Sequence, residues 1–129
     1  MNTIPFLSYE DAPAALDWLA KAFGFERSEV HERENGTGAH AEMRFADGMI
    51  MLGSAGPNDL GMKTPRELGA VNQGVYVIVD NGIDEHYERA LAAGAEVVRP
   101  LHDTDYGSRD YIVRDPEGNL WSFGTYRPK

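Results

Sequence analysis

The stretch YGSRDYIVRDPEGNLW, residues 106–121, decides the fold, because part of it has a counterpart 70 residues earlier in the chain. At that spacing Arg114 and Gly118 match Arg44 and Gly48. Just after these glycines, Ile50 matches Leu120. Toward the N-terminus the matching pairs are Phe6 and Tyr76, Leu7 and Val77, Ala20 and Ala90, and Gly24 and Gly94. A period this long exceeds the roughly 20–50 residues of solenoid repeats, so we predict one fold built from two fused modules.

Each copy has the pattern of a strand, a helix and three further strands. In the first copy the apolar segment 4–9 predicts a strand, Asp11 and Pro13 predict a helix start, and Gly24 predicts its end. Strands are predicted at 25–33, 38–46 and 49–54, with turns at Glu34-Asn35-Gly36 and Asp47-Gly48. The second copy predicts strands at 75–79, 96–100, 109–114 and 119–126, and a helix from Gly82 to Ala93 capped by Gly94.

The fold class that follows is α+β, with two tandem βαβββ modules in a single domain. We expect module one at 1–54 and module two at 74–129. The segment 55–73, which is rich in Gly and Pro and has no clear period, is predicted to be a linker that can also act as a flap. Two like modules are expected to face each other across a cleft.

Composition limits the classes of partner. The chain has 129 residues, enough for one domain, and a net charge of −9 that opposes binding to nucleic acid or to anionic lipid. It has no cysteine, which excludes disulfides and thiolate metal sites, and no apolar run of about 18 residues. We therefore expect no nucleic-acid partner, no membrane partner and a cytoplasmic location.

Strand alternation predicts which side chains line the cleft. Apolar Leu7 and Tyr9 are expected to face the helix, as are Ala41, Met43 and Phe45. The opposite face then carries Phe6, Ser8, Tyr76 and Ile78, together with His40, Glu42 and Arg44, and these three polar residues either line the cleft or face solvent. Trp18 and Trp121 are expected to be packing residues, and His31, His86 and His102 to lie on the surface.

Several motifs together resemble those of the vicinal oxygen chelate superfamily, which includes glyoxalase I, extradiol dioxygenases, fosfomycin-resistance transferases and bleomycin-resistance proteins. They are LDWL at 16–19, AFG at 22–24, EMRFADGMIMLG at 42–53, YGSRDY at 106–111 and DPEGNLW at 115–121. The resemblance covers essentially the whole chain. It implies paired βαβββ modules that curl around a shared cavity, and the pattern is nearest to the metal-free members that resemble bleomycin-resistance proteins.

The resemblance also implies where a metal would be held. In the metalloenzymes of that superfamily, His, Glu or Gln near the start of the first strand and on the last strand of each module bind a divalent ion. Those positions fall on Ile4, Leu52, Gly74 and Ser122. Such an ion needs imidazole, carboxylate or amide ligands, so we predict neither a metal nor another cofactor.

The predicted function is therefore metal-independent binding of a small molecule, sequestering an aromatic or cationic antibiotic or metabolite. The candidate ligand-binding residues are Phe6, Ser8, Ile50, Tyr76, Ile78, Tyr106, Arg109 and Ser122. Arg44 and Arg114 are either ligand contacts or surface charges, and Arg109 could instead pair with Asp105 or Asp110.

Two alternatives remain open. One is an enzyme of the lyase, isomerase or dioxygenase type that uses His40 and Glu42 as base and orienting group, or an unrecognised divalent metal site. The other is a ligand-sensing or structural dimer. The expected partners are a small-molecule ligand and a second copy of the chain.

Overall fold

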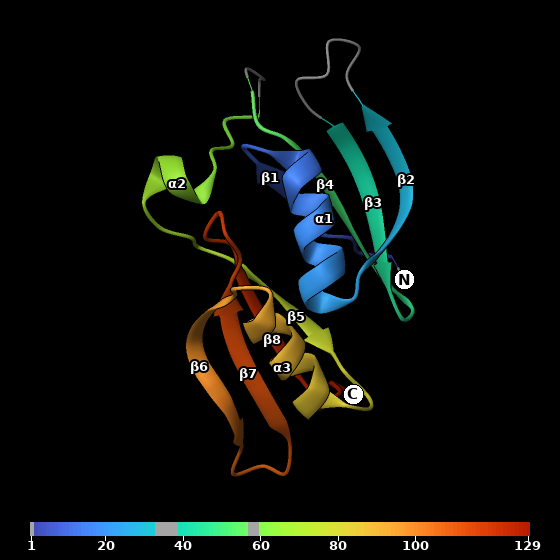
Figure 1. The fold of residues 1–129 in the computed structure, drawn as a ribbon, viewed down its shortest axis with the longest axis vertical. Coiled ribbons are helices and arrows are strands. Elements are labelled where there is room, and N and C mark those ends of the chain that lie inside the picture. Colours follow the sequence, from blue (N-terminus) through green and yellow to red (C-terminus); the bar gives the residue numbers. More distant parts are fainter. Residues whose placement is uncertain (1, 33–38, 57–59) are drawn as a thin grey trace.

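The computed structural model describes residues 2–32, 39–56 and 60–129, and its elements follow the predicted order (Figure 1). The elements are β1 (Phe6–Tyr9), α1 (Ala12–Phe23), β2 (Glu26–Glu32), β3 (Ala39–Phe45), β4 (Gly48–Ser54), α2 (Pro65–Leu68), β5 (Gly74–Ile78), α3 (Ile83–Ala92), β6 (Glu96–Asp103), β7 (Arg109–Arg114) and β8 (Leu120–Gly124). The predicted turn at Glu34-Asn35-Gly36 lies outside the described residues. In the described part of the chain, no helix is long and apolar enough to cross a membrane.

The strands form two four-stranded mixed sheets, one for each module. Their strand orders are β1-β4-β3-β2 and β5-β8-β7-β6, with the first and last strand of each module paired in parallel. The two sheets do not close into a barrel. This arrangement confirms the predicted α+β class and the two tandem βαβββ modules.

Local sequence explains the ends of the helices. The Asp11 side chain accepts a hydrogen bond from the Ala14 amide, and Gly24 ends α1 with φ +80°. In α3 the C-cap is Ala93 rather than the predicted Gly94, which follows with φ +91°. The predicted linker contains the short helix α2, because Thr64 and Glu67 form a capping box at its start.

Helices α1 and α3 lie next to each other on the same side of the sheets (Figure 1). Helix α1 packs on all four strands of its own sheet, and α3 packs on β6 and β7. The helices are also joined directly, since Trp18 Nε1 donates to the Ala93 carbonyl at 2.8 Å and Arg89 Nε donates to the Lys21 carbonyl at 2.7 Å. The helix-covered sides of both modules are therefore the sides that meet within the chain.

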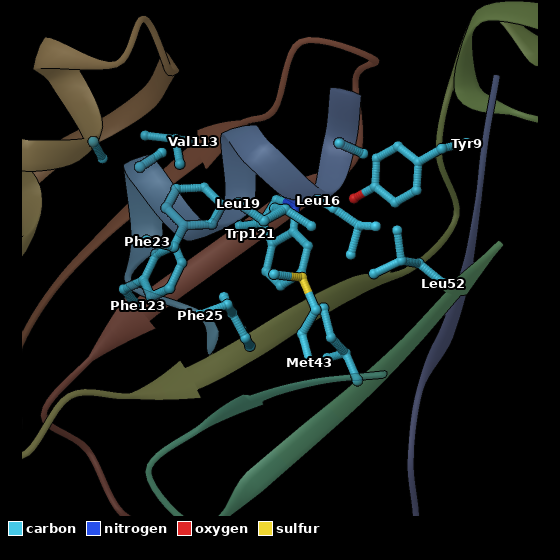
Figure 2. Close-up of a cluster of buried hydrophobic side chains, with 14 of the residues drawn as sticks. Tyr9, Leu16, Leu19, Phe23, Phe25, Met43, Leu52, Val113, Trp121 and Phe123 are labelled. Carbon is cyan, nitrogen blue, oxygen red and sulfur yellow. The ribbon is translucent and has the colours of Figure 1, made fainter. Parts of the chain in front are cut away.

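A single hydrophobic core fills this region (Figure 2). The Phe23 ring of α1 lies 5.4 Å from Trp121 and 4.5 Å from Phe123, both on β8 of the other module. Phe25 lies 5.6 Å from Trp121. The packing role predicted for Trp121 is confirmed, and burial of these large rings makes the interface between the modules part of the core.

The registers correct the predicted repeat at one point. Phe6 pairs with Met51 in sheet one, whereas its counterpart Tyr76 pairs with Ser122 in sheet two. Met51 and Ser122 are 71 residues apart, because the segment between paired Arg114 and Leu120 is one residue longer than that between paired Arg44 and Met49. The 70-residue offset thus ends at this turn, and Ile50 corresponds to Trp121 rather than to Leu120.

Candidate functional site

The sides of the two sheets that face away from the helices form the candidate site, and we call them the open faces. On module one the open face comprises Phe6, Ser8, His40, Glu42, Arg44, Met49, Met51 and Gly53. On module two it comprises Gly74, Tyr76, Ile78, Asp110, Ile112, Arg114, Leu120, Ser122 and Gly124. The buried alternates Tyr9, Ala41, Met43 and Val79 confirm the predicted assignment of strand faces.

The open faces are not enclosed within one chain. Phe6 is 60% exposed and Tyr76 is 39% exposed, although both are large aromatic residues in strands. The cleft expected between facing modules is therefore not closed, because the modules use their helix-covered sides to pack against each other. One large aromatic side chain on each sheet is therefore left exposed among polar residues.

Open-face residues line three hollows. One, of about 210 Å³, is on module one, and its lining includes Phe6, Ser8, His40, Gly53 and Met62. A second, of about 240 Å³, lies between β5 and the turn from β3 to β4, and its lining includes Met49, Tyr76 and Ile78 together with the edge of Ile50. The third, of about 150 Å³, is at the junction of β1 and β5, and its lining includes Ser8, Gly74 and Leu120. Residues 62–63 and 70–73 of the predicted linker also line this junction, so the segment borders the site, and its role as a flap stays a prediction.

A larger hollow of about 730 Å³ lies between α2 and the turn from β7 to β8, and Arg114 at the end of the open face is part of its lining. Its two arginines already have partners. Arg114 Nε lies 3.1 Å from a Glu96 carboxylate oxygen, and Arg66 Nη1 lies 3.0 Å from a Glu10 carboxylate oxygen. We do not assign the ligand site there, because the polar groups that would recognise a ligand are committed to each other.

Two of the predicted ligand-binding residues do not lie on the open faces. Ile50 is 3% exposed and belongs to the core, because the register shift places it on the helix side of β4. Arg109 is likewise on the helix side of its strand, where it pairs with Asp84 and Asp103 at 3.0 and 3.1 Å. The partners suggested by the sequence, Asp105 and Asp110, are wrong for Arg109.

The remaining predicted residues separate into groups. Phe6 and Ser8 share the open face of module one, and Tyr76, Ile78 and Ser122 share that of module two. Tyr106 lies in the turn between β6 and β7 and is exposed. Their role in ligand binding stays a prediction.

His40 and Glu42 lie on the same face of β3, opposite Gly53 and Met51 of β4. Among the residues that the structure describes, no hydrogen bond joins the two side chains. His40 instead lies against Gly53, where an added Cβ would come within 3.6 Å of its ring. The geometry needed for a base and its orienting group is thus not formed between them.

The positions implied for a metal do not fit one. Leu52 faces the core, and the register makes Met51 the structural equivalent of Ser122. With Ile4 and Gly74, these side chains supply a thioether and a hydroxyl but no imidazole, carboxylate or amide. Within the described ranges, three or more His, Asp or Glu residues do not gather as a candidate metal site. This donor set is unsuited to a divalent ion.

His86 is a residue that sequence reasoning misplaced, since it was expected on the surface. It lies between the modules, with Nε2 2.8 Å from the Phe23 carbonyl and Nδ1 2.6 Å from the Tyr111 hydroxyl. Burial lowers the pKa of His86, and nearby Arg89 acts in the same direction. Ile83 and Ala90, three residues before and four residues after His86, are buried on the same helix face. This helical spacing was the signal that could have placed His86 next to the core.

Tyr76 on the open face is held by the C-terminal segment. Its hydroxyl donates to the Tyr126 carbonyl at 2.6 Å. Burial raises the pKa of Tyr76, and the Asp110 carboxylate raises it further. Sequence reasoning missed Tyr126 and Asp110, which lie near Tyr76 only because β5 and β7 both pair with β8.

This fold and these motifs define the class of the protein. Residues 5–123 match the profile of the Glyoxalase/Bleomycin resistance protein/Dioxygenase superfamily, and the chain belongs to that superfamily.

The chain resembles particular members to different degrees. It is similar to TioX from Micromonospora sp. ML1, with 34% identity, a TM-score of 0.79, and coverage of 98% of this chain and 99% of that one. It is 35% identical over 122 residues to the uncharacterized protein Mb0911c of Mycobacterium bovis, covering 93% of this chain and 80% of that protein. The fosfomycin resistance protein FosX from Listeria monocytogenes, in a complex with Mn(II) and sulfate, shares the fold at 14% identity, with a TM-score of 0.68 and coverage of 98% and 93%.

Proposed function

We propose that the protein binds a small organic molecule on its open faces without a metal ion, and that its role is to sequester an aromatic or cationic antibiotic or metabolite. The observation that carries this proposal is a pair of uncovered sheet faces with aromatic side chains, where the implied metal positions hold Ile4, Met51, Gly74 and Ser122. Apolar surface with a few polar groups is what binding of a flat organic ligand requires.

The binding cavity of this proposal is completed by a second copy of the chain. Each module uses its helix side within the chain, and the open faces carry exposed aromatic side chains, so we assign the further interface to the open faces. Phe6, Leu60 and Tyr76 are large apolar or aromatic residues that are exposed in one copy. A two-fold dimer would cover this surface and turn the shallow hollows into an enclosed site.

A role in sequestration is supported by chemistry rather than by any single relative. Binding alone needs no arranged base or Lewis acid, and neither the His40 and Glu42 pair nor the implied metal positions provide one. The superfamily to which the chain belongs includes bleomycin resistance proteins. A protein that holds a toxic compound needs affinity and exclusion of water, which a closed aromatic cavity supplies.

The proposal is tested by thermal shift and equilibrium dialysis of chelator-treated protein against a panel of aromatic and cationic antibiotics. We expect at least one compound to raise the melting temperature, and the shift to be lost in Phe6→Ala and Tyr76→Ala. Leu91→Ala is the matched control, because Leu91 is also exposed but lies on α3. Binding that disappears on chelation and returns with a stoichiometric divalent ion would contradict the proposal.

Analytical ultracentrifugation tests the second copy. A dimer that dissociates in Phe6→Glu but not in Leu91→Glu would place the interface on the open faces. A monomer that still binds ligand with unchanged affinity would show that the second copy is not needed.

A further inference from the structure

Three tyrosines gather at one end of the open face of module two, and the proposed function does not explain why. Tyr76 comes from β5, Tyr106 from the turn between β6 and β7, and Tyr126 from the segment after β8. Tyr106 is 64% exposed and Tyr126 is 47% exposed. Their rings are 5.8 Å apart and nearly perpendicular, at 85°. Exposed rings held in this way present both a face and an edge to a ligand.

The arrangement is built into the sheet by a glycine. A Cβ added at Gly124 would come within 2.8 Å of the Asp110 Cβ and 2.9 Å of the Tyr76 hydroxyl oxygen. The missing side chain therefore lets Tyr76 lie across β8 beside Asp110. The hydrogen bond from Tyr76 to the Tyr126 carbonyl then fixes the backbone that carries the Tyr126 ring.

The acidic group beside these rings is the Asp110 carboxylate. The Asp110 side chain lies beside Tyr76, and its partner is His102, with Nε2 3.3 Å from the carboxylate. The two arginines nearest in sequence are directed elsewhere. Arg109 pairs with Asp84 and Asp103, and Arg127 pairs with Asp80 at 2.8 Å. Both guanidinium groups are therefore paired with carboxylates other than Asp110.

We infer that Tyr76, Tyr106, Tyr126 and Asp110 form a subsite for an organic cation, a quaternary ammonium or a protonated amine. The negative face of an aromatic ring attracts such a cation, and several rings beside a carboxylate reinforce the attraction. The inference rests on the proposed function and deepens it, because it assigns the cationic part of the ligand to this end of the site. The net charge of −9 favours the same class of ligand.

The test uses the full chain and two probes of nearly equal shape, choline and its uncharged isostere 3,3-dimethyl-1-butanol. Binding is followed by NMR titration and by calorimetry. We expect choline to bind saturably and the alcohol to bind at least fivefold more weakly. Equal affinity for the two probes, or no saturable binding of choline, would overturn the inference.

Side-chain changes locate the subsite. Tyr106→Leu and Tyr126→Leu should each weaken choline binding at least threefold, whereas Tyr106→Phe and Tyr126→Phe keep a ring and should stay within twofold. Asp110→Asn should weaken choline binding but leave the alcohol unchanged. Leu91→Ala, at an exposed position on α3, is the matched control. Leucine variants that fold normally and bind choline like the parent would overturn the inference.

The outcome is separable from that of the proposed function. If choline fails but an uncharged aromatic compound still gives a thermal shift that Phe6→Ala abolishes, binding on the open faces stands and only the cation subsite is lost. If choline binds as expected and no larger compound does, the subsite stands and the sequestering role fails.

Discussion

The Tyr9 hydroxyl donates a 2.7 Å hydrogen bond to the Asp115 carboxylate, which joins the first strand of module one to the turn between β7 and β8 in module two. Trp121 Nε1 donates to the same carboxylate oxygen at 3.0 Å, and the amides of Glu117 and Asn119 donate to the other. The neighbouring Glu117 carboxylate accepts from the amides of Glu10 and Asp11 at 2.6 and 3.0 Å. The DPEG motif therefore joins the two modules in addition to forming a turn.

Replacing Asp115 by Asn should destabilise the whole fold. One side-chain oxygen is replaced by an NH2 group, which cannot accept, so a buried donor loses its partner: Trp121 Nε1 at one position, or the Glu117 and Asn119 amides at the other. We expect a loss of about 2–3 kcal/mol in the free energy of unfolding, measured by urea denaturation. Asp105→Asn, at an exposed turn position, is the control and should change little. Equal stability of the two variants would show that the joint contributes nothing.

His86 should make the protein less stable in mild acid. Because burial lowers its pKa in the folded state below the ordinary value of 6.5, the unfolded chain binds the extra proton more readily. The stability due to the neutral ring is complete above about pH 6.5 and is lost as the pH falls from there toward the lowered pKa.

Urea midpoints measured between pH 7.5 and pH 5 test this prediction. His86→Gln cannot titrate and should show a smaller decrease than the parent over that range. His31→Gln, which removes an exposed histidine, should keep the full decrease. An unchanged pH profile in His86→Gln would mean that other groups cause the acid sensitivity.

The register shift in β4 predicts opposite results at two adjacent residues. Leu52 is buried in the core, so Leu52→Gln leaves a buried amide without partners and should cost about 2–4 kcal/mol. Met51 lies on the open face and is only partly buried, so Met51→Gln should cost less than about 1 kcal/mol. Chemical denaturation of both variants checks this. If Met51→Gln cost more than Leu52→Gln, the offset of 70 residues would hold through β4 and the register shift would be wrong.

The two last strands contain a further matched pair, Gly53 and Gly124, which are 71 residues apart. Gly124→Ala should destabilise by about 1–3 kcal/mol, because its Cβ would meet Asp110 and the Tyr76 hydroxyl at under 3 Å. Gly53→Ala should be tolerated, since the nearest atom lies at an ordinary 3.6 Å. Melting temperatures distinguish the two, and NMR of the Tyr76 ring should report a displacement only in Gly124→Ala.

Much of the fold was predictable because its signals are local. Asp11 and Gly24 mark the ends of α1 through hydrogen bonding and backbone conformation that depend on a few neighbouring residues. The alternation of Phe6, Leu7, Ser8 and Tyr9 shows which face of β1 is buried, since period-two patterning reflects one apolar side. For the candidate site, the sequence predicted which strand faces carry it but not the shape of the hollows on them.

The positions that could not be predicted depend on contacts between segments far apart in sequence. Ile50 was assigned to the site because the matched Gly48 and Gly118 hide a difference of one residue in turn length. A shift of one residue moves a side chain to the opposite face of a strand, and only the pairing of the strands shows it. Arg109 and His86 differ from expectation for a related reason, because their partners Asp84 and Phe23 lie in other elements.

The sequence by itself determined two βαβββ modules, their helix caps, the apolar face of each strand and the lack of suitable ligands at the implied metal positions. Only the tertiary structure decided that the helix-covered sides of the modules pack together and that the open faces are left exposed. Packing of the modules through their helix-covered sides and packing through their open faces are both compatible with the same local sequence pattern. The choice depends on the packing of Phe23 against Trp121 and Phe123 and on the bond from Tyr9 to Asp115, which join residues about 100 positions apart.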